Sequence, residues 1–376
     1  MLMGWTVILF ILLLALAAYT VAGYPLLVWW LSRRPRPTRR REDYLPFVSL
    51  LVPVFNEERV LREKLANSLA LNYPPDRLEI VFVSDGSTDG SVAILRESRD
   101  PRVRLLDFPV NRGKALAMNE TLGQLRGELV ALSDASGMLA PGALRAAVPH
   151  LADPEVGAVC GYYHIFKEDR TSADAAESSY HGFEIRLRWW EGLRRTALSG
   201  TGSFCVFRRD QYQPLPAGVI NDDFILPARL AARGLRVIYE PAAKLYDRLA
   251  TRPGDAFRRR VRIAYGNWEQ LWVLRELLDL RRGWPSWVFW SHKVLRMSLP
   301  FLLVLLGLLA LSFGPVFLSL ALLGAVALLV LGLLGLALDR FFPGHNPLAF
   351  VPLFFLNCAA VAVGTWRFWT RRGVRW

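Results

Sequence analysis

The stretch Leu129-Val130-Ala131-Leu132-Ser133-Asp134-Ala135-Ser136-Gly137-Met138 is an apolar run that ends abruptly in one carboxylate followed by small residues. This pattern is typical of a buried strand that delivers an acid to the edge of a sheet. In open α/β sheets, ligands bind outside the carboxyl ends of the strands. We therefore expect Asp134 to lie where a bound phosphate or metal ion would be met.

The flanking sequence alternates short apolar runs with helical patterns. It predicts strands at 48–55, 78–84, 103–107, 129–132 and 156–163, a further strand that ends in Arg208-Arg209, and helices at 59–71, 91–98, 114–125, 141–151 and 179–195. Strands that alternate with helices imply right-handed crossovers and parallel pairing. The region 48–280 is therefore predicted to be an α/β domain with a largely parallel sheet.

The N-terminal end is too apolar for an ordinary soluble domain. The 376 residues are 53% hydrophobic, with a mean hydropathy of +0.24, and Leu2 to Ser32 carries no charge. About 20 apolar helical residues already cross the hydrocarbon core of a bilayer. A signal peptide is the competing interpretation, but the run is too long and lacks a basic start and a cleavage site. We expect residues 1–32 to be a retained transmembrane helix.

A basic linker at 33–47 follows this span and contains Arg33, Arg34, Arg36, Arg39, Arg40 and Arg41. Basic residues beside a span tend to lie on the cytosolic side, which predicts a cytosolic domain on the cell (inner) membrane. The formal net charge of +13 is therefore attributed to a bilayer with anionic lipids rather than to nucleic acid. The cysteines show neither disulfide nor metal-ligand spacing, which fits a reducing compartment.

The C-terminal third is again apolar. Residues 281–296 mix tryptophans with basic residues, which predicts a helix lying in the membrane interface and makes His292 a surface residue. Residues 297–369 contain two or three further spans, followed by a basic tail at 370–376. Three full spans would put that tail outside, against the positive-inside tendency, so the number of spans stays open.

Three motifs at strand ends carry a family resemblance. They are Val52-Pro53-Val54-Phe55-Asn56-Glu57-Glu58, Val83-Ser84-Asp85-Gly86-Ser87-Thr88-Asp89-Gly90-Ser91 and Asn111-Arg112-Gly113-Lys114-Ala115-Leu116-Ala117-Met118-Asn119. The chain has no dinucleotide-binding or P-loop glycine motif. Together the motifs resemble successive signatures of the inverting family 2 glycosyltransferases. The resemblance spans Val48 to Gly266 and implies a GT-A fold, which is a mixed, largely parallel sheet with helices on both faces.

The resemblance also implies a donor site for a nucleotide sugar, with a UDP-sugar favoured. Asp85 would contact the nucleoside, Lys114 would lie near the base and phosphates, and Pro53, Asn56 and Glu57 would line the site. A helix-start lysine in solvent is the alternative for Lys114.

The family's metal-binding motif, Asp-x-Asp, corresponds to Asp134-Ala135-Ser136 in this chain. In the family, its carboxylates hold a divalent cation (Mg or Mn) on the donor diphosphate. Ser136 supplies a neutral oxygen in place of the second acid. Asp134 is therefore expected to bind metal weakly, or with the help of a further carboxylate.

Asn221-Asp222-Asp223-Phe224-Ile225-Leu226 resembles the Glu-Asp-x-x-Leu segment of the family, with Asp222 replacing the glutamate. The match makes Asp223 the base that removes the acceptor hydroxyl proton. Acids at a helix start would also be favourable on their own, and both interpretations can hold. The acceptor is expected to approach Gly200, Thr201 and Gly202, although a tight turn would also explain these glycines.

The run 258–266 falls where processive members carry Gln-Arg-x-Arg-Trp. Arg260 and Arg262 match the arginines, Arg259 stands for the glutamine, and Ile263 stands for the tryptophan. Arginines can bind a diphosphate through paired hydrogen bonds. Without the tryptophan, however, the motif has no aromatic ring on which the acceptor could stack. A headgroup-binding face is the alternative for this arginine run.

The sequence therefore predicts a membrane glycosyltransferase that transfers single sugars from a nucleotide donor to a lipid-linked or glycan acceptor. The closest alternative is a processive exopolysaccharide synthase of the cellulose, chitin or hyaluronan type. A second alternative, motivated by Ser136 and Ile263, is a catalytically degenerate membrane scaffold or partner subunit.

Overall fold

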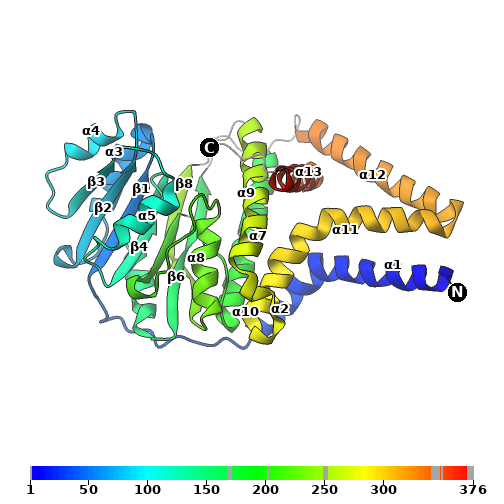
Figure 1. Ribbon diagram of the computed structural model, residues 1–376, viewed down its shortest axis with the longest axis horizontal. Helices are drawn as coiled ribbons and strands as arrows, with labels where there is room; N and C mark the ends of the chain where they lie inside the picture. The colour runs from blue at the N-terminus through cyan, green and yellow to red at the C-terminus, as the bar shows by residue number, and fades with distance from the viewer. Residues whose placement is uncertain are drawn as a thin grey trace.

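The computed structural model describes residues 2–166, 172–200, 203–248, 253–339, 348 and 350–370. It contains an α/β domain from which long apolar helices project on one side (Figure 1). The sheet has eight strands in the order β3-β2-β1-β4-β7-β6-β8-β5. Their bounds are β1 Val48–Val54, β2 Leu78–Asp85, β3 Val103–Phe108, β4 Leu129–Ser133, β5 Gly137–Leu139, β6 Val156–Phe166, β7 Phe204–Arg208 and β8 Arg236–Arg248.

The predicted mixed, largely parallel sheet is confirmed. Strands β1 to β4 pair in parallel, as do β6 and β8. Strand β7 runs antiparallel between β4 and β6, and β5 is antiparallel to β8. The parallel half places the carboxyl ends of β1, β2 and β4 at one edge, as a ligand site requires.

Helices cover both faces of the sheet, because successive strand residues point to opposite sides. Leu51 and Val81 pack under α5 (Lys114–Leu122) and α8 (Asp222–Ala232). Leu50 and Ile80 pack on the other face, which carries α3 (Glu58–Leu69), α4 (Ser91–Arg96) and α6 (Ala143–Ala147). Both sets of strand residues are fully buried, so the sheet separates two hydrophobic cores.

Some elements differ from the sequence-based expectation. The helix expected at 141–151 is α6 followed by a 3-10 turn at Val148–Ala152, because Pro149 has no backbone N–H for a continuing α-helix. Strands β5 and β8 were not predicted. β8 contains Pro241, and its pairing with β6 shifts register between Glu240 and Lys244, so its pattern is not that of a regular strand.

Three helices in the described part of the chain are long and apolar enough to cross a membrane: Trp5–Ser32, Trp284–Phe313 and Val351–Trp369. The first joins α1 (Leu2–Ala18) to α2 (Tyr24–Ser32) through a π-helical turn, Tyr19–Gly23. The second joins α10 (Trp284–Val288) to α11 (Leu295–Ala310) through another π-helical turn, Phe289–Val294. The segment expected as a separate interfacial helix at 281–296 is therefore the start of a longer continuous helix.

The expectation that His292 is a surface residue is wrong. Its side chain is 13% exposed and lies between two carboxylates of α7 (Ser172–Arg194), with Nε2 at 2.9 Å from Glu184 Oε2 and Nδ1 at 2.6 Å from Glu191 Oε1. The same Glu191 oxygen accepts a 2.6 Å hydrogen bond from Tyr24 Oη on α2. The apolar helices Trp5–Ser32 and Trp284–Phe313 are thus both bonded to α7 of the α/β domain.

The remaining helices differ in direction. α1 and α11 run side by side across the view in Figure 1, and they pack through Ala17, Leu302 and Leu306. α12 (Pro315–Asp339) returns toward the α/β domain, whereas α13 (Phe350–Trp369) is seen nearly end-on. α13 packs against α9 (Pro253–Val273), where Trp268 Nε1 donates a 2.9 Å hydrogen bond to Thr365 Oγ1. α13 therefore lies crosswise to α1 and α11.

Candidate active site

A cavity of about 630 Å³ opens at the carboxyl ends of β1, β2 and β4. Its wall is completed by α5, α7, α8, α9 and the helix that begins at Trp284. The structure thereby brings together most of the residues singled out from the sequence. They are Pro53, Glu57, Asp85, Lys114, Asp134, Ser136, Gly200, Asp222, Asp223, Arg259 and Arg262.

Four predicted residues are not part of this wall as described. Thr201 and Gly202 lie outside the described residues, and neither Asn56 nor Arg260 lines the cavity. Asn56 instead shapes the loop after β1: it has a positive φ of 56°, and its side-chain oxygen accepts a 2.8 Å hydrogen bond from the Thr88 N–H. Asparagine tolerates this left-handed conformation better than most residues do.

Asp85 is buried and holds the loop before α5. Its carboxylate accepts hydrogen bonds from the Arg112 N–H at 3.0 Å and the Gly113 N–H at 2.7 Å. The next residue, Gly86, has a φ of 71°, and a Cβ there would lie 2.4 Å from the Asn111 nitrogen. Asp85 therefore fixes the position at which α5 begins.

Lys114, the first residue of α5, joins two carboxylates. Its Nζ is 2.9 Å from Asp134 Oδ1 and 2.9 Å from Asp222 Oδ2. The other oxygen of Asp134 accepts a 3.2 Å hydrogen bond from Ser203 Oγ. Burial alone would lower the pKa of Lys114, but the charges of Asp134 and Asp222 outweigh burial and raise it well above its usual value. Lys114 is therefore a permanent cation at physiological pH, and not a lysine in free solvent.

Asp223 lies in the first turn of α8, beside Asp222. Burial raises the pKa of Asp223, and the neighbouring charge of Asp222 raises it further. The Asp223 carbonyl accepts a 2.8 Å hydrogen bond from the Gly200 N–H, and a Cβ at Gly200 would lie 3.1 Å from that carbonyl oxygen. Gly200 thus permits a close approach of the backbone to the start of α8. The favourable helix-start position of both acids is also observed.

The start of α8 is held from α9. Asn221 Nδ2 donates hydrogen bonds of 3.2 Å to the Ile263 carbonyl and 3.3 Å to Asn267 Oδ1. Gly266 makes this contact possible, because a Cβ there would lie 2.8 Å from Asn221 Nδ2. The helix that carries Arg259 and Arg262 is therefore connected directly to the helix that carries Asp223.

Sequence reasoning missed several residues of the cavity wall. Arg188 comes from α7, Gln270 from α9, and Lys293 from the apolar helix Trp284–Phe313. Lys293 Nζ lies 4.4 Å from the centre of the Phe224 ring. The buried Gln270 amide has no hydrogen-bond partner among the described residues. A charged residue within an apolar span is itself a signal of function, and it would have identified Lys293.

The charge distribution suits an anionic ligand. Arginine and lysine side chains from four helices reach the wall: Lys114, Arg188, Arg259, Arg262 and Lys293. Guanidinium groups bind phosphates in a bidentate manner and stabilise charge that develops on a leaving group. Within the described ranges, no group of three or more acidic, histidine or cysteine side chains gathers that could hold a metal ion. A cation at Asp134 would need further oxygen ligands from a bound substrate.

Replacing Lys114 by Met should lower the thermal unfolding midpoint near neutral pH, because Asp134 and Asp222 would then repel each other without a cation between them. We expect a loss of about 1–3 kcal/mol in unfolding free energy. The contribution of Lys114 is complete below its unfolded-state pKa of 10.5, since the folded-state pKa is raised.

Lys244→Met is the matched control, since Lys244 is exposed on β8 and lies outside the cavity wall. An equal effect of both substitutions would contradict the bridging role of Lys114.

Comparisons with known proteins agree with this architecture. The family model described as Glycosyl transferase family 2 matches residues 49–213. The poly-beta-1,6-N-acetyl-D-glucosamine synthase of Staphylococcus aureus (strain COL) is 26% identical over 234 residues, which are 61% of this chain and 56% of that protein. The Staphylococcus epidermidis synthase is 25% identical over 244 residues, which are 64% of this chain and 57% of that protein. The match thus spans little more than half the length of these relatives.

A solved structure has the same fold. The mannosyltransferase PcManGT from Pyrobaculum calidifontis, in complex with GDP-Man and Mn²⁺, superposes with a TM-score of 0.73 at 23% sequence identity. The superposition covers 97% of this chain and 100% of the other. Residues 49–213 therefore match the glycosyl transferase family 2 model, and the chain has a GT-A fold.

Proposed function

We propose that this protein is an inverting glycosyltransferase that moves a sugar from a nucleotide-diphosphate donor to an acceptor at the bilayer. The observation that carries the proposal is the bridge from Asp134 through Lys114 to Asp222, with Asp223 beside it. This bridge supports a site in which Asp134 faces the donor phosphates and Asp223 faces the acceptor. The family membership and the poly-N-acetylglucosamine synthases among the relatives support the same chemistry.

The donor would lie along the carboxyl edge of the sheet. Its nucleoside would be next to Asp85, with Pro53 and Glu57 in the adjacent wall. Its diphosphate would be met by Arg259 and Arg262. We propose a UDP-sugar as donor. GDP-mannose, which the mannosyltransferase structure contains, is the competing donor.

A divalent cation fits this site only together with the donor. One oxygen of Asp134 accepts a hydrogen bond from Lys114 and the other accepts one from Ser203. Without the donor, Asp134 is therefore poorly available as a metal ligand. Mg²⁺ is commonly held by one or two carboxylates plus substrate phosphates, and Asp134 would be such a ligand. When bound, the cation would neutralise charge on the leaving diphosphate. The Mn²⁺ in the mannosyltransferase structure supports this assignment.

Asp223 is the proposed base. The acceptor O–H gives its proton to the Asp223 carboxylate while the acceptor oxygen bonds to the anomeric carbon and the bond to the diphosphate breaks. Asp222 is less suited to this role, because its carboxylate is paired with Lys114. The raised pKa of Asp223 also makes it a better proton acceptor than an ordinary aspartate.

The acceptor is proposed to be lipid-linked or a glycan, and to receive one sugar. Ile263, which is 38% exposed in the cavity wall, stands where a processive enzyme would carry tryptophan. The named activity of the polymer-forming relatives favours the second candidate, a processive synthase. Purified protein given one nucleotide sugar and acceptor should yield a single product, and a ladder of longer products would favour the processive candidate.

The directions of the helices support a particular membrane arrangement. We propose that α1 and the α11–α12 pair cross the inner membrane and that α13 lies along its cytosolic surface, crosswise to them (Figure 1). This arrangement leaves the catalytic domain and the basic tail at 370–376 both in the cytosol, as the positive-inside tendency favours.

Replacing Asp223 by Asn should reduce transfer by about 10²–10⁴-fold, the usual contribution of a general base, while nucleotide-sugar binding stays close to that of wild type. The wild-type rate should fall as the pH drops through the raised pKa of Asp223, and this acidic limb should be absent from the variant. Initial rates across pH and calorimetric donor binding measure both effects.

Asp210→Asn, on the exposed turn Arg209–Gln211, is the control and should change neither quantity. Unchanged turnover in the Asp223 variant would refute the base assignment. A wild-type protein that binds donors without turning them over would instead support the scaffold alternative.

A reporter fused after Trp376 tests the membrane arrangement. A C-terminal fluorescent protein, which fluoresces only when it folds in the cytosol, should be bright. A fused periplasmic phosphatase should be inactive. The opposite pattern would contradict a surface position for α13.

A further inference from the structure

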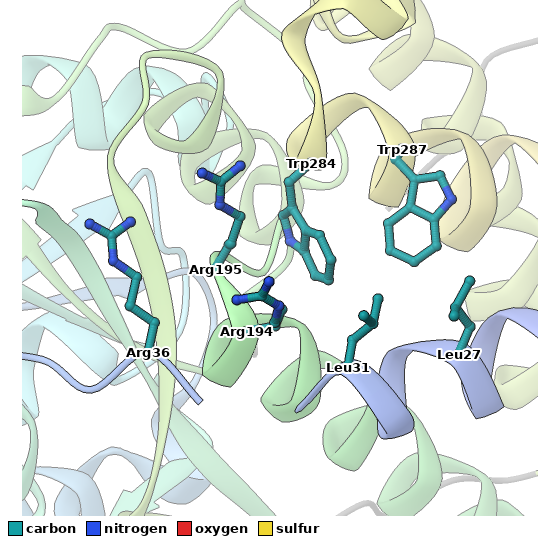
Figure 2. A pocket seen from close by; sticks show the side chains of 7 residues that line it. All are labelled: Leu27, Leu31, Arg36, Arg194, Arg195, Trp284 and Trp287. Atoms are coloured by element: carbon teal, nitrogen blue, oxygen red, sulfur yellow. The ribbon is translucent and has the colours of Figure 1, made fainter. Parts of the chain in front are cut away.

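A second cavity, of about 740 Å³, lies apart from the catalytic cavity, between α2, the C-terminal end of α7 and α10. It is lined by Leu27, Leu31, Arg36, Arg194, Arg195, Trp284 and Trp287. Figure 2 shows the arginines gathered toward one side and Leu27, Leu31 and Trp287 toward the other, with Trp284 between them. The cavity is therefore charged on one side and apolar on the other.

The cavity lies where two apolar helices of membrane-crossing length join the α/β domain. Leu27 and Leu31 belong to the last turns of the apolar helix Trp5–Ser32, and Trp284 begins the apolar helix Trp284–Phe313. Two helices of membrane-crossing length thus meet the α/β domain at this point. Tryptophans at such a boundary commonly lie at the level of lipid headgroups.

The tryptophan rings are held in place. Trp284 Nε1 donates a 2.9 Å hydrogen bond to the Thr196 carbonyl, and Trp287 Nε1 donates a 3.0 Å hydrogen bond to Tyr19 Oη. Because their polar atoms are already bonded, these rings present apolar faces to the cavity. The cavity is built into the fold and does not depend on a chance arrangement of side chains.

The charges are available for a ligand. The side chains of Arg194 and Arg195 have no ion-pair or hydrogen-bond partner among the residues that the structure describes. Arg36 is paired with Glu155 at 2.6 Å. Arginines at a helix C-terminus also interact favourably with the helix dipole, which can explain why Arg194 ends α7 and Arg195 follows it. That interaction does not account for two such guanidinium groups beside an apolar wall at the membrane boundary.

Much of the basic linker is already engaged, although the sequence suggested that its arginines bind headgroups. Arg33 stacks on the Trp29 ring at 4.1 Å, Arg40 pairs with Glu42 at 2.6 Å, and Arg41 pairs with Asp43 at 2.8 Å. The linker backbone is also fixed to the domain, since the Arg36 N–H donates a 2.8 Å hydrogen bond to the Leu193 carbonyl. This bond connects the linker to the same end of α7 that carries Arg194.

We propose that this cavity binds the phosphate of an anionic phospholipid from the cytosolic leaflet. Arg194 and Arg195 donate hydrogen bonds to the phosphate oxygens, and the start of an acyl chain follows Leu27, Leu31 and Trp287. Free phosphate could make the same contacts with the arginines, but it would make no contact with Leu27, Leu31 and Trp287 on the apolar side. The bound lipid would link the first membrane helix, α7 and the helix from Trp284 at a single point.

The test uses the full chain in a neutral detergent, titrated with fluorescently labelled phosphatidylglycerol or phosphatidylcholine. Wild type should bind phosphatidylglycerol more tightly, and the double variant Arg194→Gln/Arg195→Gln should lose about tenfold or more in affinity, because two charge-assisted contacts are removed. The control is Arg59→Gln/Arg99→Gln. It removes the same charge from exposed positions near α3 and α4, on the side of the sheet away from the membrane helices (Figure 1).

Three results would overturn the proposal. These are equal binding of the two lipids by wild type, wild-type affinity in the Arg194/Arg195 variant, and an equal loss in the control, which would mean attraction by net charge only. Inorganic phosphate should not displace the labelled lipid at matched ionic strength. Displacement would assign the arginines to a free anion and refute the lipid. The comparison of phosphatidylglycerol with phosphatidylcholine on the wild-type protein tests the proposal even if the variant does not fold.

Discussion

The ion pairs of Lys114 with Asp134 and Asp222 are the interaction on which the candidate site depends. Asp134 follows β4 on the sheet, whereas Asp222 begins α8, almost ninety residues later in the chain. One partly buried ammonium lets two acids from separate elements lie close together, which would otherwise cost free energy through repulsion. Asp223, in the same first turn of α8, has no ion pair with a lysine among the described residues, and its pKa is raised.

The apolar helices contribute to the site as well as to membrane attachment. Lys293 lies in the cavity wall, and the preceding residue, His292, is bonded to Glu184 and Glu191 on α7. Burial alone would raise the pKa of Glu184, but the charges of Arg296 and His292 outweigh it and hold that pKa well below its usual range. Because Glu184 also lines the cavity, the apolar helix Trp284–Phe313 and the candidate active site share one buried charge network.

The sequence predicted the parallel half of the fold well, because short apolar runs ending in Asp85 and Asp134 carry a local signal. It did not predict β8, whose irregular pairing interrupts the alternation of side chains, or the role of Lys293, which depends on a helix remote in sequence packing over Phe224. Arg260 was grouped with its neighbours by motif. On a helix, however, adjacent residues point in different directions, and only Arg259 and Arg262 reach the cavity among the described arginines of that run.

An experimental structure of the full chain with Mn²⁺ and an unreactive nucleotide-diphosphate sugar would show whether the cavity at the carboxyl edge is a donor site arranged for attack beside Asp223. The diphosphate should lie between Asp134 and the guanidinium groups of Arg259 and Arg262, with the anomeric carbon facing Asp223. A nucleotide bound elsewhere, or a sugar turned away from Asp223 toward solvent, would contradict it.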